Sequence, residues 1–514
     1  MNFKNIKYAY FLGIGGIGMS AIARYFNHQG IKVYGYDKTE TPLTKELQHE
    51  GIEVHYADLG VEIFAFKFDP KETLVVLTPA IPKDLQEWKW LRNNEFTIMK
   101  RSQVLGIISD EYKTIAVAGT HGKTTTSTLI AHILKQSKVD CAAFLGGISA
   151  NYNSNLLLHK KFTDHGSQIT DNTVNGEPST GNKYLIVEAD EFDRSFLTLH
   201  PSISIITSTD ADHLDIYGKH EELKKSFLDF ASQTKDTLII KKELDLVHTL
   251  PLNHPEKDIK SPVQMLHSIE AEKDIEPPVQ TLHATSQQME TKTYSIIEKA
   301  DFYAKNIQIK GDNYFFDLHF ENEILKELNL GIPGLHNVEN AVAASAVAIL
   351  SGVTEEELRS ALASFHGVKR RFEYIIKTDK MVYIDDYAHH PEELKAIISS
   401  VKQMYRGKKV TAIFQPHLYS RTRDFVEGFA ESLSLADDVL LLDIYPAREL
   451  PIQDVSSEMV FNKMKMDHKM LCSRKDVLDI IEKKKPEVLL TLGAGDIDQL
   501  VEPLRLLLNN MKMK

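Results

Sequence analysis

Short apolar segments alternate with longer amphipathic segments along most of the chain. The apolar segments have the length of buried strands, and the amphipathic ones carry apolar residues at helical spacing. This alternation predicts an α/β protein in which parallel sheets are joined by helical crossovers. Three strand–turn–helix units are the clearest, at Tyr8–Gly18, Thr114–Thr126 and Met381–Leu394. Each is expected to open a separate doubly wound unit.

The length of 514 residues is too great for a single hydrophobic core, so several domains are expected. We predict one boundary near Glu111, before the strand that starts at Thr114, and another near Gly367. The predicted domains therefore cover residues 1–111, 112–367 and 368–514.

Two stretches of the middle domain interrupt the pattern. Residues 159–183 are polar and show almost no apolar periodicity. Residues 252–293 contain a near-repeat, in which Glu256–His267 recurs as Glu272–His283. Two copies are too few for a solenoid, which needs at least three. Both stretches are interpreted as surface insertions without chemistry, and deleting the repeat is expected to spare activity.

Composition narrows the class of protein further. The net charge of −12 argues against nucleic acid as the main partner. No apolar run reaches the roughly 20 residues of a membrane-spanning helix, and the amino terminus lacks a signal-peptide pattern. The two cysteines, Cys141 and Cys472, lie far apart and are expected to be reduced thiols. We therefore expect a cytoplasmic protein without membrane insertion.

The most informative motif joins an apolar strand to a helix at residues 115–126. Glycines at 119 and 122 let the backbone curl so that successive N–H groups face an anion, and a helix N-terminus follows. Lys123 can reach the β- and γ-phosphates, and the Thr124 hydroxyl can ligate Mg²⁺. The predicted nucleotide-binding residues here are Gly119, Thr120, His121, Gly122, Lys123, Thr124 and Thr125.

Acidic residues follow the next two predicted strands. Glu188 ends one strand, and His213 follows the next, within the sequence Asp-Ala-Asp-His. Ligands of such sheets bind at the carboxyl ends of the strands, so these groups should lie near the phosphate loop. Oxygen and imidazole ligands suit Mg²⁺ ions that bridge ATP and a reacting carboxylate. Side chains at these strand ends are therefore candidate Mg²⁺ ligands.

A second glycine-rich turn lies near the amino terminus. The sequence Gly-Ile-Gly-Gly-Ile-Gly follows the strand Tyr8–Leu12, and Asp37 closes the next strand, where a dinucleotide-binding fold places its ribose-binding acid. The pattern alone does not say which nucleotide binds, so a dehydrogenase remains an alternative at this point. The predicted binding residues are Gly13, Gly15, Gly16, Gly18 and Asp37.

The last third of the chain has four more strands that end in polar or glycine-rich loops. One strand runs into Asp386, Tyr387 and His389, and a later loop carries Arg421, whose guanidinium suits carboxylate or phosphate. These loops should define one edge of a cleft.

The motifs GTHGKTTT, EADEFD, DADHLD, GLHNVENA, GVKRRFE, DDYAHHPEEL, FQPHLYSRTRD and LGAGD resemble, in this order, those of the Mur ligase family. The resemblance covers nearly the whole chain. It implies a Rossmann-like N-terminal domain for a UDP-sugar, a central P-loop ATPase-type domain and a Rossmann-like C-terminal domain. It assigns the GIGGIG turn to the UDP-sugar phosphates, which removes the dehydrogenase alternative.

The resemblance also implies roles for individual residues. Lys123, His213, His389 and Arg421 are the implied catalytic groups. Thr124, Glu188 and His213 match the positions of the family's Mg²⁺ ligands. His336, Asn337, Asn340 and Asp386 are expected at the nucleotide, and Tyr387, His389 and Arg421 face the incoming amino acid. One departure is Leu418, where many relatives carry Arg after Gln-Pro-His.

Together with GIGGIGMS, the motifs are most similar to those of the family member that couples L-alanine to UDP-N-acetylmuramate. That resemblance implies ATP and Mg²⁺ as cofactors, an acyl-phosphate intermediate, and a monomer or homodimer. One alternative is the recycling ligase that attaches a tripeptide to the same UDP-sugar. Another is an inactive, nucleotide-gated binding protein, against which the intact Lys123, Thr124, Glu188 and His213 count.

Overall fold

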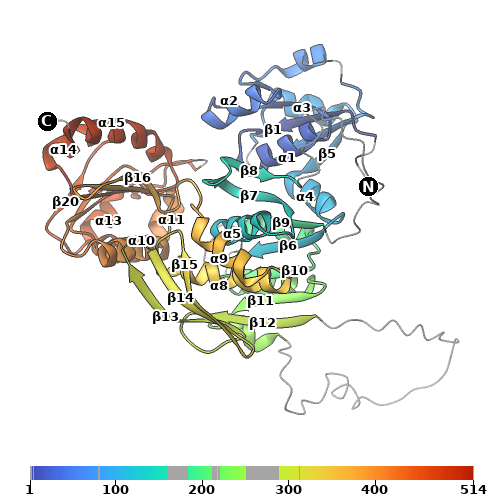
Figure 1. Ribbon diagram of the computed structural model, residues 1–514. Helices are drawn as coiled ribbons and strands as arrows, with labels where there is room; N and C mark the ends of the chain where they lie inside the picture. The colour runs from blue at the N-terminus through green and yellow to red at the C-terminus, as the bar shows by residue number, and fades with distance from the viewer. Residues whose placement is uncertain are drawn as a thin grey trace, which may run out of the picture.

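The computed structural model describes residues 3, 5–66, 68–78, 81–159, 183–210, 217, 220–250, 289–311, 313–447 and 449–512. Three sheets follow one another along the chain, each covered by helices (Figure 1). The N-terminal domain contacts the strands β7 (Cys141–Ser149) and β8 (Ser154–Leu157) of the central domain through helix α1 (Ile17–His28), and the C-terminal domain contacts the central helix α8 (Leu335–Leu350) through helix α10 (Pro391–Met404). The α/β class with mostly parallel sheets, expected from the alternation of patterns, is confirmed. The exact domain limits stay a prediction.

The N-terminal sheet has five parallel strands in the order β3-β2-β1-β4-β5. Its elements are β1 (Tyr8–Leu12), α1 (Ile17–His28), β2 (Lys32–Tyr36), α2 (Pro42–His49), β3 (Glu53–His55), β4 (Thr73–Leu77), α3 (Gln86–Asn93), β5 (Thr97–Lys100) and α4 (Arg101–Ser109). The buried strand β1 lies at the centre, so the turn that follows it opens at the middle of the sheet edge.

The central sheet has ten strands in the order β15-β14-β13-β12-β11-β10-β6-β9-β7-β8. Its strands are β6 (Lys113–Ala118), β7 (Cys141–Ser149), β8 (Ser154–Leu157), β9 (Tyr184–Glu188), β10 (Ile203–Ile206), β11 (Thr237–Lys241), β12 (Glu290–Ser295), β13 (Phe302–Lys310), β14 (Asn313–Phe320) and β15 (Glu323–Leu330). Its helices are α5 (Lys123–Gln136), α7 (His220–Ser232), α8 (Leu335–Leu350) and α9 (Glu355–Ser364). Parallel strands β9, β6 and β10 are adjacent, so their carboxyl ends share one edge.

The C-terminal sheet has six strands in the order β16-β17-β21-β18-β19-β20. Its strands are β16 (Glu373–Lys377), β17 (Val382–Asp386), β18 (Val410–Phe414), β19 (Asp438–Leu441), β20 (Lys469–Leu471) and β21 (Val488–Leu492). Its helices are α10 (Pro391–Met404), α11 (Tyr419–Asp424), α12 (Val426–Leu433), α13 (Ser457–Lys463), α14 (Val477–Lys484) and α15 (Val501–Lys512). Only β16 pairs antiparallel within the described part of this sheet.

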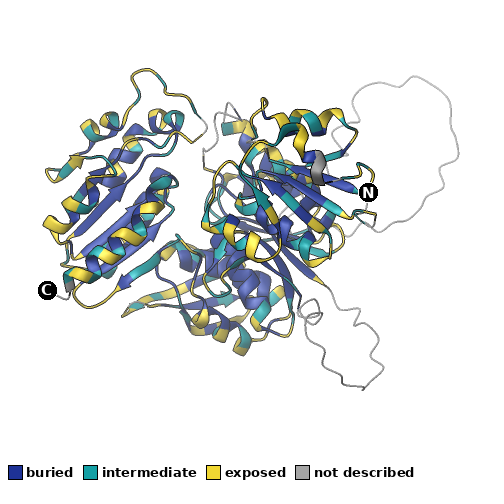
Figure 2. Cartoon of the chain, turned by 90° about the horizontal axis from the view of Figure 1, so that it is seen from above, coloured by how far each residue is buried: buried dark blue, intermediate teal, exposed yellow. Residues whose placement is uncertain are grey.

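Burial follows the predicted pattern. Most strands are dark in Figure 2, although β13 and β15 carry exposed residues, and most helices are buried on the face toward their sheet. Helices α5 and α8 are buried more deeply, because eleven of fourteen residues of α5 and eleven of sixteen residues of α8 are buried where the two helices pack. This anchoring fixes the position at which α5 begins, which is where the phosphate loop ends.

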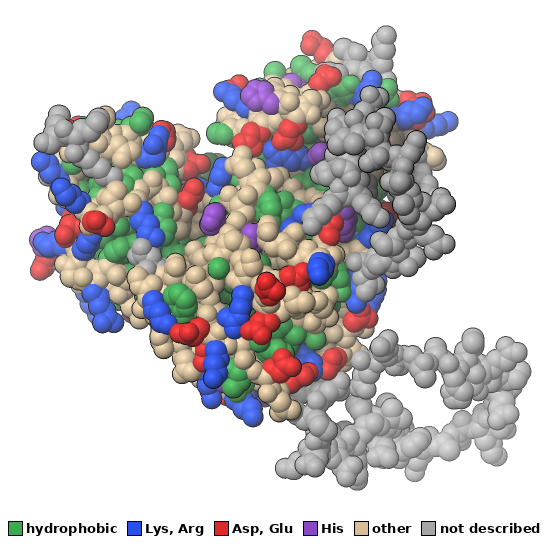
Figure 3. All heavy atoms as spheres, in the orientation of Figure 1, with side chains coloured by type: hydrophobic (Ala, Val, Ile, Leu, Met, Phe, Trp, Pro, Cys, Tyr) green, Lys and Arg blue, Asp and Glu red, His purple; other side chains and the backbone are tan. Residues whose placement is uncertain are grey.

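The surface agrees with the composition. On the face drawn in Figure 3, Lys and Arg side chains are interspersed with Asp and Glu side chains over the described residues. Among those residues, no helix is both long and apolar enough to cross a membrane.

Candidate active site

The phosphate loop connects β6 to α5 through two glycines with left-handed backbone. Gly122, just before α5, has φ +82°, and Gly119 has φ +136°. A Cβ at Gly119 would lie 2.1 Å from Oγ1 of Thr207, which follows the adjacent strand β10. Glycine is therefore required at this position both by conformation and by space.

The end of β10 holds the loop in shape. Oγ1 of Thr207 donates to the backbone oxygen of His121 at 2.5 Å, and the backbone N–H of His121 donates to Oγ of Ser208 at 2.7 Å. Thr120 and Ser208 bring their hydroxyl oxygens to 2.9 Å. These bonds order the backbone of the loop, and they engage the N–H groups of Thr120 and His121 with Ser208.

Lys123, the first residue of α5, points back into the loop. Its Nζ donates to the Gly119 carbonyl oxygen at 2.6 Å and lies 2.8 Å from Oε2 of Glu191. Burial alone would lower the pKa of Lys123, but the carboxylates of Glu191, Glu188 and Asp190 outweigh it and raise the pKa. Lys123 is therefore a fixed positive charge within the loop.

Thr124 and Glu188 form an oxygen-rich pair beside this lysine. The Thr124 hydroxyl donates to Oε2 of Glu188 at 2.9 Å. Burial raises the pKa of Glu188, although the positive charge of Lys123 opposes the rise. Gly146 of β7 lies so close that a Cβ there would be 1.9 Å from Oε2 of Glu188. The carboxylate is thus confined to one position next to the loop.

This pair fits Mg²⁺ by its chemistry. Mg²⁺ usually takes one or two protein oxygens and completes its shell with nucleotide phosphates and water. Within the described part of the chain, no three His, Cys, Asp or Glu side chains gather into a metal cluster. The predicted ligand His213 lies outside the described residues.

Two cavities flank the loop and share residues. One, of about 320 Å³, is lined by Lys123, Thr124, Glu188 and Asp190 together with residues of the C-terminal domain. The other, of about 190 Å³, holds the predicted His336, Asn337 and Asn340 on α8. Burial lowers the pKa of His336 to about 4, helped by the charge of Arg371, so its imidazole is neutral at pH 7. The shared lining gives room for an extended nucleotide.

Two asparagines of α8 hold one wall of the second cavity in place. Nδ2 of Asn340 donates to Oδ1 of Asn337 at 3.3 Å, and Oδ1 of Asn340 accepts from the Thr126 hydroxyl at 3.1 Å. A Cβ on Gly122 would lie 2.8 Å from the same Oδ1. Helix α8 is therefore locked against the start of α5.

The C-terminal domain contributes the loop after β17. The carboxylate of Asp386 accepts backbone N–H groups of Phe372 and Ala388 at 2.7 and 2.8 Å. Burial raises the pKa of Asp386 to about 6, against the opposing charge of Arg371. The ring of Tyr387 lies 5.2 and 5.1 Å from the guanidinium carbons of Arg370 and Arg371, within cation–π range.

His389 lies in the same loop and faces the phosphate cavity. Its Nδ1 is 2.9 Å from the backbone oxygen of Tyr387, which makes Nδ1 the donor and leaves Nε2 as an acceptor. Burial lowers the pKa of His389 to about 4; Glu393 opposes this shift, and the nearby charge of Arg421 adds to it. The charge of Arg421 is thus close enough to influence the protonation of His389.

Arg421 is buried in α11, behind the loop that carries Leu418. Leu418 has φ +71°, which is unusual for a branched aliphatic side chain, and its N–H donates to the Tyr445 carbonyl oxygen at 3.0 Å. His417 brings its ring within 6.0 Å of His389. Leu418, which replaces the Arg of many relatives, therefore has a strained backbone conformation. It lies in the part of the site that is predicted to bind the amino acid.

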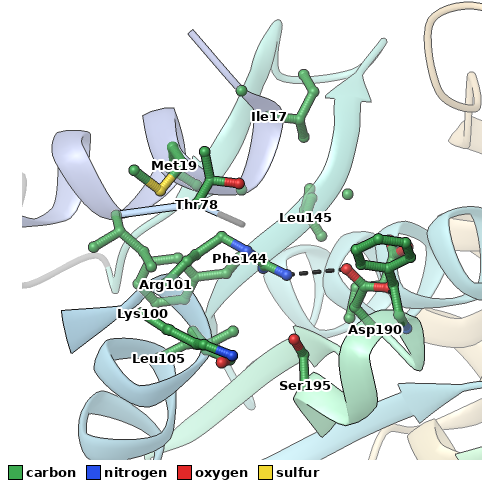
Figure 4. A pocket seen from close by; sticks show the side chains of 18 residues that line it. Ile17, Met19, Thr78, Lys100, Arg101, Leu105, Phe144, Leu145, Asp190 and Ser195 are labelled. Atoms are coloured by element: carbon green, nitrogen blue, oxygen red, sulfur yellow. Dashed lines mark hydrogen bonds and ion pairs between the residues drawn. The ribbon is translucent and has the colours of Figure 1, made fainter. Parts of the chain in front are cut away.

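The N-terminal turn lines a third cavity, of about 410 Å³, shown in Figure 4. Gly16 and Gly18 reach it from the start of α1, whereas the predicted Asp37 accepts the backbone N–H of Gly15 at 2.8 Å and so shapes the turn. Glu188 and Asp190 line this cavity as well as the phosphate cavity. The two spaces therefore meet at the end of β9.

Sequence reasoning did not select six charged residues that the structure places at the phosphate cavity and at the cavity of the N-terminal turn. They are Lys100, Arg101, Asp190, Glu191, Arg371 and Glu393. Glu191 and Arg371 stand inside recognised motifs, and Glu393 is four residues after His389, so the motifs held a signal. Arg101 lies outside these motifs, directly after β5.

Comparison with family models matches three consecutive segments of the chain. Residues 8–113 match the Mur ligase family catalytic domain, residues 117–348 match the Mur ligase middle domain, and residues 370–495 match the Mur ligase glutamate ligase domain.

Individual proteins match over almost the full length. A UDP-N-acetylmuramate–L-alanine ligase of Porphyromonas gingivalis is 47% identical over 505 residues, covering 97% of this chain and 98% of its own. The enzyme of that name from Flavobacterium johnsoniae is 43% identical over 509 residues, covering 99% of each. The crystal structure of UDP-N-acetylmuramate-alanine ligase MurC from Thermotoga maritima, 25% identical, superposes with a TM-score of 0.73 and covers 99% of this chain and 100% of its own. The chain belongs to the Mur ligase family.

Proposed function

We propose that the protein uses ATP to join L-alanine to the carboxylate of UDP-N-acetylmuramate, with release of ADP and phosphate, in peptidoglycan precursor synthesis. The full-length relatives that carry this activity in their names support the choice of substrates. We further propose that it acts in the cytoplasm, as a monomer or homodimer.

One observation carries the proposal. The end of β9 is shared by the cavity at the N-terminal turn and the cavity at the phosphate loop, through Glu188 and Asp190. A UDP-sugar held at the turn can therefore extend its carboxylate toward Lys123. A nucleotide held between Lys123 and Asn340 can present its γ-phosphate at the same place. This arrangement suits the transfer of a phosphoryl group to a carboxylate.

In the first step, an oxygen of the substrate carboxylate attacks the γ-phosphorus and ADP leaves. Lys123 and the loop amides offset the charge that builds on the transferring phosphoryl oxygens. Thr124 and Glu188 would hold Mg²⁺, which neutralises phosphate charge when bound. Glu191 keeps the Lys123 ammonium at the loop.

In the second step, the neutral amine of L-alanine attacks the carbonyl carbon of the acyl phosphate. The amide bond forms as the C–O bond to phosphate breaks. His389 offers Nε2 as the acceptor for a proton of the amine, since its Nδ1 donates to the backbone. Arg421, near His389, is the proposed partner of the alanine carboxylate.

Phosphate release from ATP, measured with UDP-N-acetylmuramate and either L-alanine or the tripeptide, tests the proposal. Release that depends on L-alanine, together with the mass of the alanyl product, is the expected result. Release only with the tripeptide would assign the protein to recycling. No turnover with either acceptor would favour a nucleotide-gated binding protein.

A further inference from the structure

We propose that Arg101 binds an anionic group of the UDP-sugar and that Asp190 holds its guanidinium in place until the substrate arrives. This inference rests on the proposed function and deepens it. The glycine-rich turn has no basic side chain of its own, and Arg101 would supply the positive charge that binds the substrate. The anionic group is either the diphosphate or the carboxylate of the substrate.

The position of Arg101 is fixed by two elements. It is the first residue of α4, directly after β5, and thus stands at the carboxyl edge of the N-terminal sheet. A Cβ on Gly18 would lie 2.8 Å from its Nη1 and 3.0 Å from its Cδ. The last glycine of the turn therefore makes room for this side chain, which lies against the start of α1.

Arg101 reaches across the cavity to the central domain. Its Nη2 donates to Oδ2 of Asp190 at 3.0 Å, as the dashed line in Figure 4 shows. Asp190 follows β9, and its other oxygen accepts the backbone N–H of Phe192 at 3.1 Å. The carboxylate is thus anchored by its own loop, and it orients the guanidinium over the space that joins the two substrate cavities.

The pair is poised for exchange because it is only partly buried. The side chains are 20% exposed for Arg101 and 38% exposed for Asp190. Ion pairs that retain this contact with water contribute little stability, so an incoming anion can replace one. A phosphate or carboxylate offers two oxygens to the planar guanidinium and binds it more strongly than a single carboxylate oxygen.

The neighbouring cation provides a matched comparison. Lys100 also lines the cavity but pairs with Asp193, and both of these side chains are more exposed, at 52% and 41%. Its ammonium lacks the fork geometry that recognises two oxygens at once. If the substrate were attracted only by positive charge, Lys100 and Arg101 would contribute similarly to its binding. If the guanidinium recognises the anion specifically, only the loss of Arg101 should weaken binding strongly.

The test is direct binding, by calorimetry on the full chain, of UDP-N-acetylmuramate and UDP-N-acetylglucosamine to the wild type and to Arg101→Gln, Arg101→Lys and Lys100→Gln. The second ligand has the diphosphate but lacks the carboxylate. ATP affinity and thermal melting report whether each variant is folded with an intact nucleotide site.

Arg101→Gln should weaken UDP-N-acetylmuramate binding about 10-fold or more and leave ATP affinity unchanged. Arg101→Lys should recover part of the loss, and Lys100→Gln should cost less than about 3-fold. If Arg101→Gln loses affinity for UDP-N-acetylglucosamine to the same extent, Arg101 binds the diphosphate. If its affinity for UDP-N-acetylglucosamine is unchanged, Arg101 binds the carboxylate.

Unchanged UDP-N-acetylmuramate affinity in Arg101→Gln, or an equal loss in Lys100→Gln, would overturn the inference while the proposed function stands. A wild-type protein that binds ATP but neither UDP-sugar would overturn the proposed function and this inference with it.

Discussion

The carboxylate of Glu393, at the start of α10, lies 3.3 Å from Nδ1 of His121 in the phosphate loop. The same carboxylate accepts the backbone N–H of His389 at 2.9 Å and lies 3.7 Å from Nη1 of Arg371. Burial would raise the pKa of Glu393, but His389, His121 and Arg371 hold it well below its usual value. Glu393 thus joins the C-terminal domain to the nucleotide loop as a permanent anion.

Replacing Glu393 with Gln should weaken this junction and misplace His389. We expect kcat/KM for L-alanine to fall about 10-fold or more, because hydrogen bonds to charged groups are lost. Steady-state kinetics measure the effect, and the exposed Glu431→Gln on α12 is the matched control. Equal kinetics of the two variants would show that the junction does not position the site.

Lys123→Ala should reduce turnover at least about 100-fold, since one preorganised charge at the transition state is lost. It should also destabilise the fold, because Glu191, which is only 1% exposed, loses its partner. Chemical denaturation of Lys123→Ala and of Lys123→Ala/Glu191→Gln separates the two effects. The double variant should recover stability without activity. Recovery of both would contradict a chemical role for Lys123.

Gly146→Ala should displace Glu188 from the phosphate loop, because the added Cβ would occupy the position of its carboxylate. Activity is expected to fall, and the Mg²⁺ concentration that gives half-maximal activity is expected to rise. A Mg²⁺ titration of the wild type and the variant measures both. Loss of activity with an unchanged Mg²⁺ requirement would separate Glu188 from the metal.

Acid should destabilise the protein through its buried histidines. Burial lowers the pKa of His132, His336 and His389 to about 4, whereas an unfolded histidine titrates near 6.5. Between these values the unfolded chain binds protons that the folded chain does not, so the free energy of unfolding falls as pH drops from 6.5 toward 4. Buried carboxyl groups with a raised pKa oppose this trend, because they bind protons in the folded chain; they include Asp386, with a pKa of about 6, and Glu188, Glu339 and Asp385.

Urea unfolding at several pH values across this window measures the slope. Of the three histidines, His132 is the one that does not line the nucleotide cavities. His132→Gln should flatten the pH dependence, even if the variant is less stable at pH 7. A slope identical to that of the wild type would show that His132 does not contribute.

Local patterns were sufficient for the sheet edges and the phosphate loop. The strand predicted at Tyr8–Leu12 is β1 with the same bounds, and Lys123 opens α5 as the Gly-Lys-Thr motif predicts. The bounds of a strand and the start of a helix depend on residues that are close in sequence and on the change from apolar to polar residues where a strand ends.

Contacts between domains were not predictable in this way. His121 and Glu393 are 272 positions apart, and Arg101 and Asp190 are 89 apart. Only the packing of the three sheets brings these charges together, and no periodicity within a segment encodes it. The roles assigned to His389 and Arg421 stay predictions that rest on family resemblance and on their shared place in the site.

The most direct test of the central claim is the fate of oxygen in the first step. UDP-N-acetylmuramate labelled with ¹⁸O in its carboxylate is incubated with ATP, Mg²⁺ and L-alanine, and the released phosphate is analysed by mass spectrometry. Formation and aminolysis of an acyl phosphate predict one labelled oxygen in each phosphate and an alanyl product. Unlabelled phosphate, formed by attack of water on ATP, would contradict the account.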